Sequence, residues 1–196
     1  MRFKALDRLY LRCRYDQFIS GALHEDGRRY LPQIVVTPLD AGTDTAAGTR
    51  LWLVDRHHRV DPTLVGQIIN VRLLCALSSI RMQVPPLRAG FIPSPTETAT
   101  APLSEPVIYG QVADVLTWEV QHEHLPFETL YTELVIRLSE RATIGLRTTL
   151  SAPRITDLIG CAELLTGHWI EIQRSRIDIL TLETDCTEPV QSTGLY

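Results

Sequence analysis

The sequence contains an internal repeat in which Gly66 and Gly167 lie 101 residues apart. Residues 64–71 read Leu-Val-Gly-Gln-Ile-Ile-Asn-Val, and residues 165–172 read Leu-Thr-Gly-His-Trp-Ile-Glu-Ile. The leucine, the glycine and the second apolar residue after it recur in place. Self-similarity of this kind predicts one supersecondary plan that is used twice. We therefore expect both glycines to occupy a tight backbone position at the start of a strand.

The composition is typical of a globular protein. Of 196 residues, 44% are hydrophobic and 21% are charged, and no apolar run approaches the roughly 18–20 residues that cross a bilayer. The first eight residues are charged throughout and lack the apolar core of a secretion signal, so we expect a cytoplasmic protein. The four cysteines are too widely spaced for a zinc ribbon or a redox pair, and a cytoplasmic protein would keep them reduced.

The net charge of −4 is unevenly divided along the chain. Residues 1–90 carry 13 Lys and Arg against 8 Asp and Glu, whereas residues 91–196 carry 6 against 15. Such halves attract each other or attract different partners. Four prolines among Thr and Ser make 91–106 typical of a linker. We predict a basic β-barrel module at 1–90, a Pro/Thr-rich linker at 91–106, an acidic β-barrel module at 107–185 and a flexible tail at 186–196.

Alternation of apolar and polar residues predicts five strands in each module. They fall at 5–19, 30–39, 49–56, 66–75 and 78–84, and then at 107–120, 130–139, 142–150, 167–173 and 176–183. Between the third and fourth strands of the second set, Ile155, Leu158, Ile159 and Ala162 have the spacing of one apolar helix face. We expect this helix to be short, because Gly160 interrupts it.

The order of three strands, a helix and two strands resembles the OB-fold superfamily. The resemblance covers residues 107–184 and, less completely, residues 5–84, where residues 55–62 leave little room for a helix. It implies a mainly β protein with two small OB-like β-barrels in tandem, the second with a short helix between strands 3 and 4. The open face and loops of such a barrel bind single strands, oligosaccharides or other proteins.

The strongest functional signal is a set of arginine and aromatic side chains in the first module. On residues 9–14 and 50–56, alternation sends the leucines to the core and leaves a second set facing outward: Tyr10, Arg12, Arg14, Arg50, Trp52 and Arg56. An aromatic plane among guanidinium groups stacks bases and neutralises phosphates. The alternative interpretation is that Trp52 belongs to the core and the arginines form a solvated face.

Motifs of catalysis are missing from the sequence. It has no nucleophile elbow, phosphate-binding loop, dinucleotide-binding turn or His-Glu-x-x-His motif. His122 and His124 have no third ligand near them in sequence, so we interpret this stretch as a solvated loop and expect no metal and no cofactor. We expect a non-catalytic protein that engages single-stranded DNA or RNA through its first module. The alternative is a protein-protein interaction or assembly factor that uses its barrels as docking surfaces.

Overall fold

The computed structural model describes residues 3–92, 106–120 and 128–184, and it is mainly β, as predicted. In chain order the elements are η1 (Leu6–Arg8), β1 (Leu11–Ile19), β2 (Gln33–Pro38), β3 (Leu51–Val54), η2 (Pro62–Leu64), β4 (Ile68–Met82), β5 (Gly90–Ile92), β6 (Val107–Val120), β7 (Glu128–Ser139), β8 (Ala142–Thr148), α1 (Ala152–Ile159) and β9 (Trp169–Thr184). The strands follow the alternation in the sequence closely, and the best match is β6, whose predicted and observed bounds agree.

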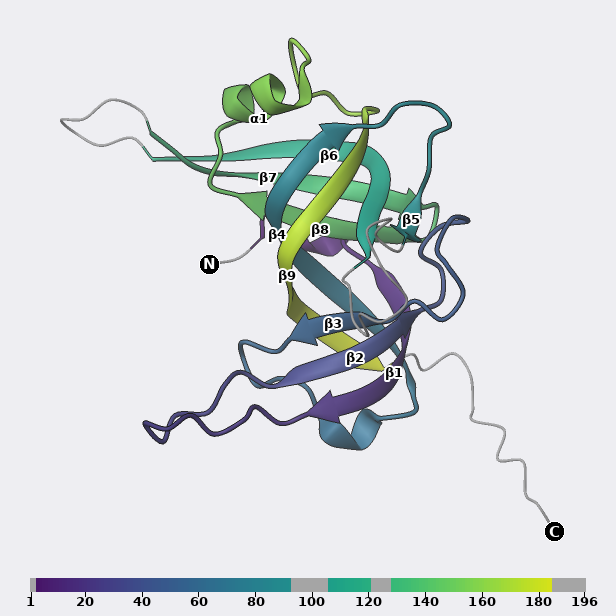
Figure 1. The fold of residues 1–196 in the computed structure, drawn as a ribbon, viewed down its shortest axis with the longest axis vertical. Coiled ribbons are helices and arrows are strands. Elements are labelled where there is room, and N and C mark those ends of the chain that lie inside the picture. The colour runs from purple at the N-terminus through teal and green to yellow at the C-terminus, as the bar shows by residue number, and fades with distance from the viewer. Residues whose placement is uncertain (1–2, 93–105, 121–127, 185–196) are drawn as a thin grey trace.

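Strand pairing forms two circuits that share β4 and β9. In the first circuit, β1 pairs with β2, β2 with β3, β3 with β9, β9 with β4, and β4 again with β1. In the second circuit, β6 pairs with β7, β7 with β8, β8 with β4, β4 with β9, and β9 again with β6. Figure 1 shows β9 passing from the part of the molecule that holds β6, β7 and β8 to the part that holds β1, β2 and β3. The two circuits therefore have the same pairing order.

This arrangement departs from the prediction of two self-contained modules at 1–90 and 107–185. Strand β9 lies in the circuit of the first half, and β4 lies in the circuit of the second half. The alternation predicts a break near residue 76 and another near residue 175, but neither place has the Gly or Pro of a tight turn. The chain instead continues as one 15-residue strand in β4 and one 16-residue strand in β9.

Irregular pairing explains why each long strand has the sequence pattern of two short ones. The register between β4 and β9 shifts between Arg72 and Leu73, between Ala76 and Leu77, and again before Ser79. Each β-bulge inserts an extra residue and resets which side chains face the core. In the sequence, such a reset of the alternation looks the same as the boundary between two strands.

The predicted linker begins inside the sheet. Strand β5 occupies residues 90–92, where Phe91 is fully buried and lies opposite Ile108 of β6. The linker boundary at residue 91 was therefore wrong, because Phe91 and Ile92 are apolar residues that complete the edge beside β6. The remainder of the expected linker, residues 93–105, and the expected tail lie outside the described residues.

One continuous apolar core fills both circuits. It joins Leu11 and Leu53 of the first half to Ile136 and Ile144 of the second, with Ile172 of β9 in the same cluster. Because this cluster crosses the expected module boundary, apolar burial stabilises the two halves together.

The N-terminal segment covers part of the outer face of the second circuit. Phe3 and Leu9 pack with Leu74 and Val135 in a separate apolar cluster. Gly145 on β8 leaves room for this segment, since a Cβ atom there would lie 3.0 Å from the Phe3 ring. The outer face of β7 and β8 is therefore occupied by the protein's own chain.

Both repeat glycines have the backbone conformation that the sequence predicted. Gly66 has φ +91° and Gly167 has φ +98°, and each lies two residues before a long strand. The Gly66 N–H donates to the carbonyl oxygen of Tyr15 at 2.7 Å, and the Gly167 N–H donates to that of Val112 at 2.8 Å. A Cβ atom at either position would meet no atom within 4 Å, so the positive φ itself favours glycine.

The predicted helix is present as α1 and ends at Gly160, which has a left-handed φ of +69°. Ile155 and Ile159 are buried beneath it, as expected. Leu158 was expected on the same face but is 57% exposed. A helix of 8 residues buries only two of the four predicted positions, because it contacts the core along a narrow stripe and ends before Ala162, which is exposed.

Candidate functional site

The outer face of β1, β2 and β3 holds most of the predicted site. Leu11, Cys13 and Tyr15 of β1 point into the core, so Arg12 and Arg14 lie on the opposite face. On β3, Leu51 and Leu53 are buried, which places Trp52 on the outer face and Arg50 directly before the strand on the same side. The alternation therefore brings Arg12, Arg14, Arg50 and Trp52 to one face of the first circuit.

Cross-strand register sets the spacing on this face. Arg14 lies opposite Thr37 of β2, and Trp52 lies opposite Val35, two residues from Thr37. Trp52 is partly buried, and Val35 is 1% exposed even though its side chain is on the outer face. Trp52 therefore lies beside a buried valine and is itself partly exposed, which combines features of both interpretations that the sequence left open.

The second circuit has a different arrangement at the corresponding position. There Val135 of β7 lies opposite Gly145 of β8, and Phe3 packs over the pair. A phenylalanine from the N-terminal segment packs on the valine in the second circuit, whereas in the first circuit the residue opposite the valine is a tryptophan of the neighbouring strand. Within the described part of the chain, Arg14 and Arg50 are exposed on this face and Trp52 is partly exposed.

Tyr10 and Arg56 lie at the margins of this face. The backbone of Tyr10 exchanges hydrogen bonds with Thr143 of β8 at 3.0 and 2.7 Å, which places Tyr10 beside the second circuit. Arg56 follows the end of β3, and its Nε lies 3.2 Å from Asp178 Oδ2. The structure does not group these two side chains with Trp52.

The arginines of the predicted site differ in whether an ion pair balances their charge. Arg14 Nε lies 2.7 Å from Asp16 Oδ1, so its charge is locally balanced, as is that of Arg56. Arg12 is partly buried between neighbouring strands. Arg50 is exposed and forms no ion pair with any residue in the described part of the chain. Its guanidinium group is the best placed of the four to receive a phosphate.

The charge difference between the halves is partly used inside the molecule. Arginines from the first half form ion pairs with carboxylates from the second: Arg8 with Asp114, Arg56 with Asp178 at 3.2 Å, Arg72 with Glu183 at 3.8 Å and Arg81 with Glu171 at 2.5 Å. The attraction between oppositely charged halves that the composition allowed is therefore present. It accounts for part of the basic excess without any external partner.

A basic loop follows β3 and contains Arg56 of the predicted site together with three residues that were not predicted for it. Asp55 is 1% exposed, and its carboxylate accepts hydrogen bonds from the backbone N–H groups of His57, Arg59 and Val60 at 3.2, 3.1 and 2.9 Å. The loop held by this carboxylate exposes four consecutive side chains: Arg56, His57, His58 and Arg59. An aspartate at the end of a strand, directly before a basic run, was the available signal.

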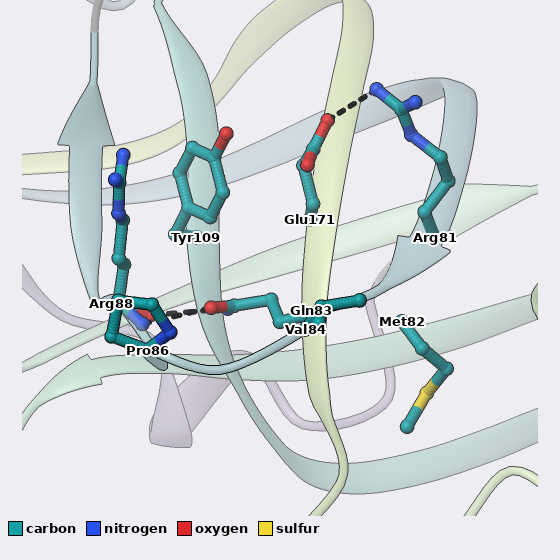
Figure 2. Close-up of a pocket in the computed structure, with 8 residues that line it drawn as sticks. All are labelled: Arg81, Met82, Gln83, Val84, Pro86, Arg88, Tyr109 and Glu171. Carbon is teal, nitrogen blue, oxygen red and sulfur yellow. Dashed lines mark hydrogen bonds and ion pairs between the residues drawn. The ribbon is translucent and has the colours of Figure 1, made fainter.

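Two cavities lie outside the predicted face. One, of about 410 Å³, is lined by residues at the end of β4 together with Tyr109 and Glu171 (Figure 2). The other, of about 470 Å³, lies against α1 and includes Asp114 and Glu163. Asp114 is paired with Arg8, so the negative charge of this lining lies mainly at Glu163.

Within residues 3–92, 106–120 and 128–184, no group of three or more His, Cys, Asp or Glu residues is arranged to hold a metal ion. His122 and His124 lie outside these ranges. In the same part of the chain, no helix is long and apolar enough to cross a membrane.

Comparison with known proteins found no relative of this chain. No protein-family model matches the chain, and neither the curated proteins nor the solved structures contain a match.

Proposed function

We propose that this protein is a non-catalytic binding protein that holds single-stranded nucleic acid against the outer face of β1, β2 and β3. As part of this proposal, each circuit is an OB-like barrel. Three strands, a short helical segment and a fourth strand follow one another in each half, and the other half supplies the fifth strand. In OB-folds, the face of strands 2 and 3 and the neighbouring loops bind oligonucleotides.

The observation that carries the proposal is the adjacency of Arg50 and Trp52. They are two residues apart at the start of β3, so both side chains lie on the same face. The exposed guanidinium is without an ion pair among the described residues, and the indole ring is partly exposed. Stacking on an aromatic ring beside a phosphate-binding cation is how single strands are held without sequence preference. Arg12, Arg14 and the basic loop after Asp55 continue the surface on either side.

Fluorescence anisotropy with a labelled oligothymidylate tests the proposal. We expect binding at low salt that weakens with a log–log slope of roughly −0.7 per phosphate contact. Trp52→Ala should weaken binding by about 1–3 kcal/mol through lost stacking, while Trp52→Phe should retain most of the affinity. Arg50→Ala should flatten the salt slope by about one contact. Arg141→Ala, an exposed arginine at the β7–β8 turn, is the matched control and should bind like the wild type.

An absence of binding at low salt, or equal losses in Arg50→Ala and Arg141→Ala, would overturn the proposal. A separate unfolding measurement on Trp52→Ala is needed, because Trp52 lies opposite the buried Val35 on the same face of the sheet. Arg50→Ala has no such packing role, so it distinguishes lost contact from lost folding.

The second candidate function is docking to another protein. It is favoured by the loop between β1 and β2, where Leu23 is 64% exposed, Tyr30 is 59% exposed and Leu31 is 40% exposed. Apolar side chains exposed together on a projecting loop are typical of interaction sites. If the oligonucleotide fails to bind, a Leu23→Asp, Tyr30→Asp double variant should lose partners that co-purify with the wild type.

A further inference from the structure

The cavity of about 410 Å³ lies at the carboxyl end of β4, where β4, β9 and β6 run side by side (Figure 2). It is separate from the proposed nucleic-acid surface. Arg12 of that surface is opposite Asn70 near the start of β4, whereas the cavity begins at Arg81 near the end of the same strand.

The floor of the cavity is a row of side chains that crosses three strands. Arg81 of β4 lies opposite Glu171 of β9, and Glu171 lies opposite Tyr109 of β6. Arg81 Nη2 is 2.5 Å from Glu171 Oε1, so these two charges balance each other. Tyr109 lies beside this ion pair and is partly buried.

Arg88 brings a second guanidinium group to the cavity, and Gln83 fixes the backbone that carries it. The Gln83 Oε1 atom accepts a hydrogen bond from the Arg88 N–H at 2.8 Å. Its Nε2 group donates to the carbonyl oxygens of Arg88 at 3.1 Å and Ile170 at 2.9 Å. The loop from residue 83 to residue 88 is thereby tied to β9.

The charge of Arg88 is not balanced within the described part of the protein. Arg81 pairs with Glu171, but Arg88 has no carboxylate within ion-pair distance among the described residues. In Figure 2 the Arg88 side chain stands on one side of Tyr109, and Glu171 stands on the other. The cavity therefore carries a net positive charge located at Arg88.

Tyr109 offers a neutral hydroxyl group next to that charge. Burial raises the pKa of its phenol, and the negative charge of Glu171 and a hydrogen bond to Glu171 raise it further, while Arg88 and Arg81 act in the opposite direction. The hydroxyl therefore stays protonated at neutral pH and donates to the Glu171 carboxylate, which leaves the Tyr109 ring as the part that can contact a ligand.

An apolar wall completes the cavity. Val84 is 82% exposed, and Pro86 follows it on the loop that Gln83 holds. A volume of about 410 Å³ is at the lower end of the range for small-molecule pockets and exceeds what an inorganic anion fills. A ligand that matches these features has an anionic group for Arg88 and a flat body for the wall.

We propose that this cavity binds a small phosphate ester with a planar ring, of the size of a nucleoside monophosphate. The phosphate accepts hydrogen bonds from the Arg88 guanidinium, which suits planar, two-pronged recognition of phosphate oxygens. The ring lies between Tyr109 and the wall formed by Val84 and Pro86, where aromatic and apolar contacts stabilise it. The neutralised Arg81–Glu171 pair leaves Arg88 as the group that selects for the anion.

Isothermal titration calorimetry of the full chain with adenosine 5′-monophosphate tests this site. We expect saturable binding to the wild type and a loss of affinity by a factor of roughly 10 to 100 in Arg88→Ala, since a hydrogen bond to a charged group is lost. Arg88→Lys should retain part of the affinity, because the charge remains but the planar fork does not. Arg141→Ala, which alters an exposed arginine far from the cavity in sequence, should bind like the wild type.

Ligand fragments decide which part of the proposal holds. Adenosine and inorganic phosphate should each bind much more weakly than the monophosphate, because each lacks one of the two recognised parts. Equal binding of inorganic phosphate would overturn the ring contact, and equal binding of benzoate would overturn the preference for phosphate. No heat with adenosine 5′-monophosphate, or an unchanged affinity in Arg88→Ala with the fold intact by circular dichroism, would overturn the site as a whole.

Discussion

Val54 on β3 lies opposite Asp178 on β9 in parallel register, and this pair closes the first circuit. The two residues come from opposite halves of the chain. The Asp178 carboxylate also forms ion pairs with two arginines. Its Oδ2 lies 3.2 Å from Arg56 Nε, and its Oδ1 lies 2.9 Å from Arg176 Nε. A backbone contact and two charge contacts therefore meet at the place where the halves join.

Cleavage between the halves should not release two independent domains. We expect that a protease site introduced at Thr98, once cut, leaves both fragments in one folded complex, because β4 and β9 pair along most of their length. Size-exclusion chromatography before and after cleavage, in buffer and in urea, measures this. Two separately folded fragments in buffer would contradict it and would restore the interpretation of independent modules.

Alanine at either repeat glycine should destabilise the protein through the backbone alone. Gly66 and Gly167 have φ of +91° and +98°, and a Cβ atom added to either would have no neighbour within 4 Å. We therefore expect Gly167→Ala to lower the free energy of unfolding by about 1–3 kcal/mol, as measured by urea denaturation. Gly167→Asn is the matched control and should cost less, because asparagine tolerates positive φ better. Equal losses in both variants would point to packing instead.

The buried hydroxyl of Tyr15 should make the protein sensitive to alkaline pH. This hydroxyl has no hydrogen-bond partner among the described residues, and burial is the main reason that the pKa of Tyr15 rises to about 12. The unfolded chain ionises near pH 10, so the contribution of Tyr15 is fully present below pH 10 and is lost as the pH rises toward 12.

Tyr15→Phe tests this relationship at two pH values. At pH 8 the variant should be as stable as the wild type or more stable by up to about 1 kcal/mol, since an unpaired buried polar group is removed. Between pH 8 and pH 11 it should lose less stability than the wild type. A Tyr30→Phe variant, altered at an exposed tyrosine, is the control. Parallel losses in all three proteins would contradict the role given to Tyr15.

Thiol labelling should distinguish the cysteines of the folded protein. Cys13 and Cys75 are fully buried, and burial, assisted by the charges of Asp16 and Asp40, raises the pKa of the Cys13 thiol. The thiolate is the reactive form, so neither residue should react with iodoacetamide at pH 8 until the protein unfolds. Cys161 is partly exposed and should react before Cys13 and Cys75. Mass spectrometry of tryptic peptides gives the order, and early labelling of Cys13 would contradict the buried position.

Local features of the fold were predictable because their causes lie within a few residues. The bounds of β6, the helix on Ile155 and Ile159, and the backbone position of Gly167 all follow from alternation, helical spacing and the glycine itself. Alternation also placed Trp52 on the correct face.

Long-range features were not predictable from the same patterns. Alternation specifies which face of a strand is buried, but it does not specify the neighbouring strand. Nothing near Arg56 indicates that Asp178 balances its charge, and nothing near Trp52 indicates that Val35 lies opposite it. The cavity at Arg88 depends on Tyr109 and Glu171 from two other strands, so its residues are far apart in the sequence.

The position of β9 in both circuits also determines when the protein can fold during synthesis. Residues 169–184 supply the neighbour that both β3 and β6 need, so neither circuit closes while the ribosome still holds this strand. Until then the nascent chain presents unpaired strand edges, which are prone to association with other chains. A premature stop before Trp169 should consequently yield an insoluble chain. Its first half should fail to fold even though every residue of that half has been made.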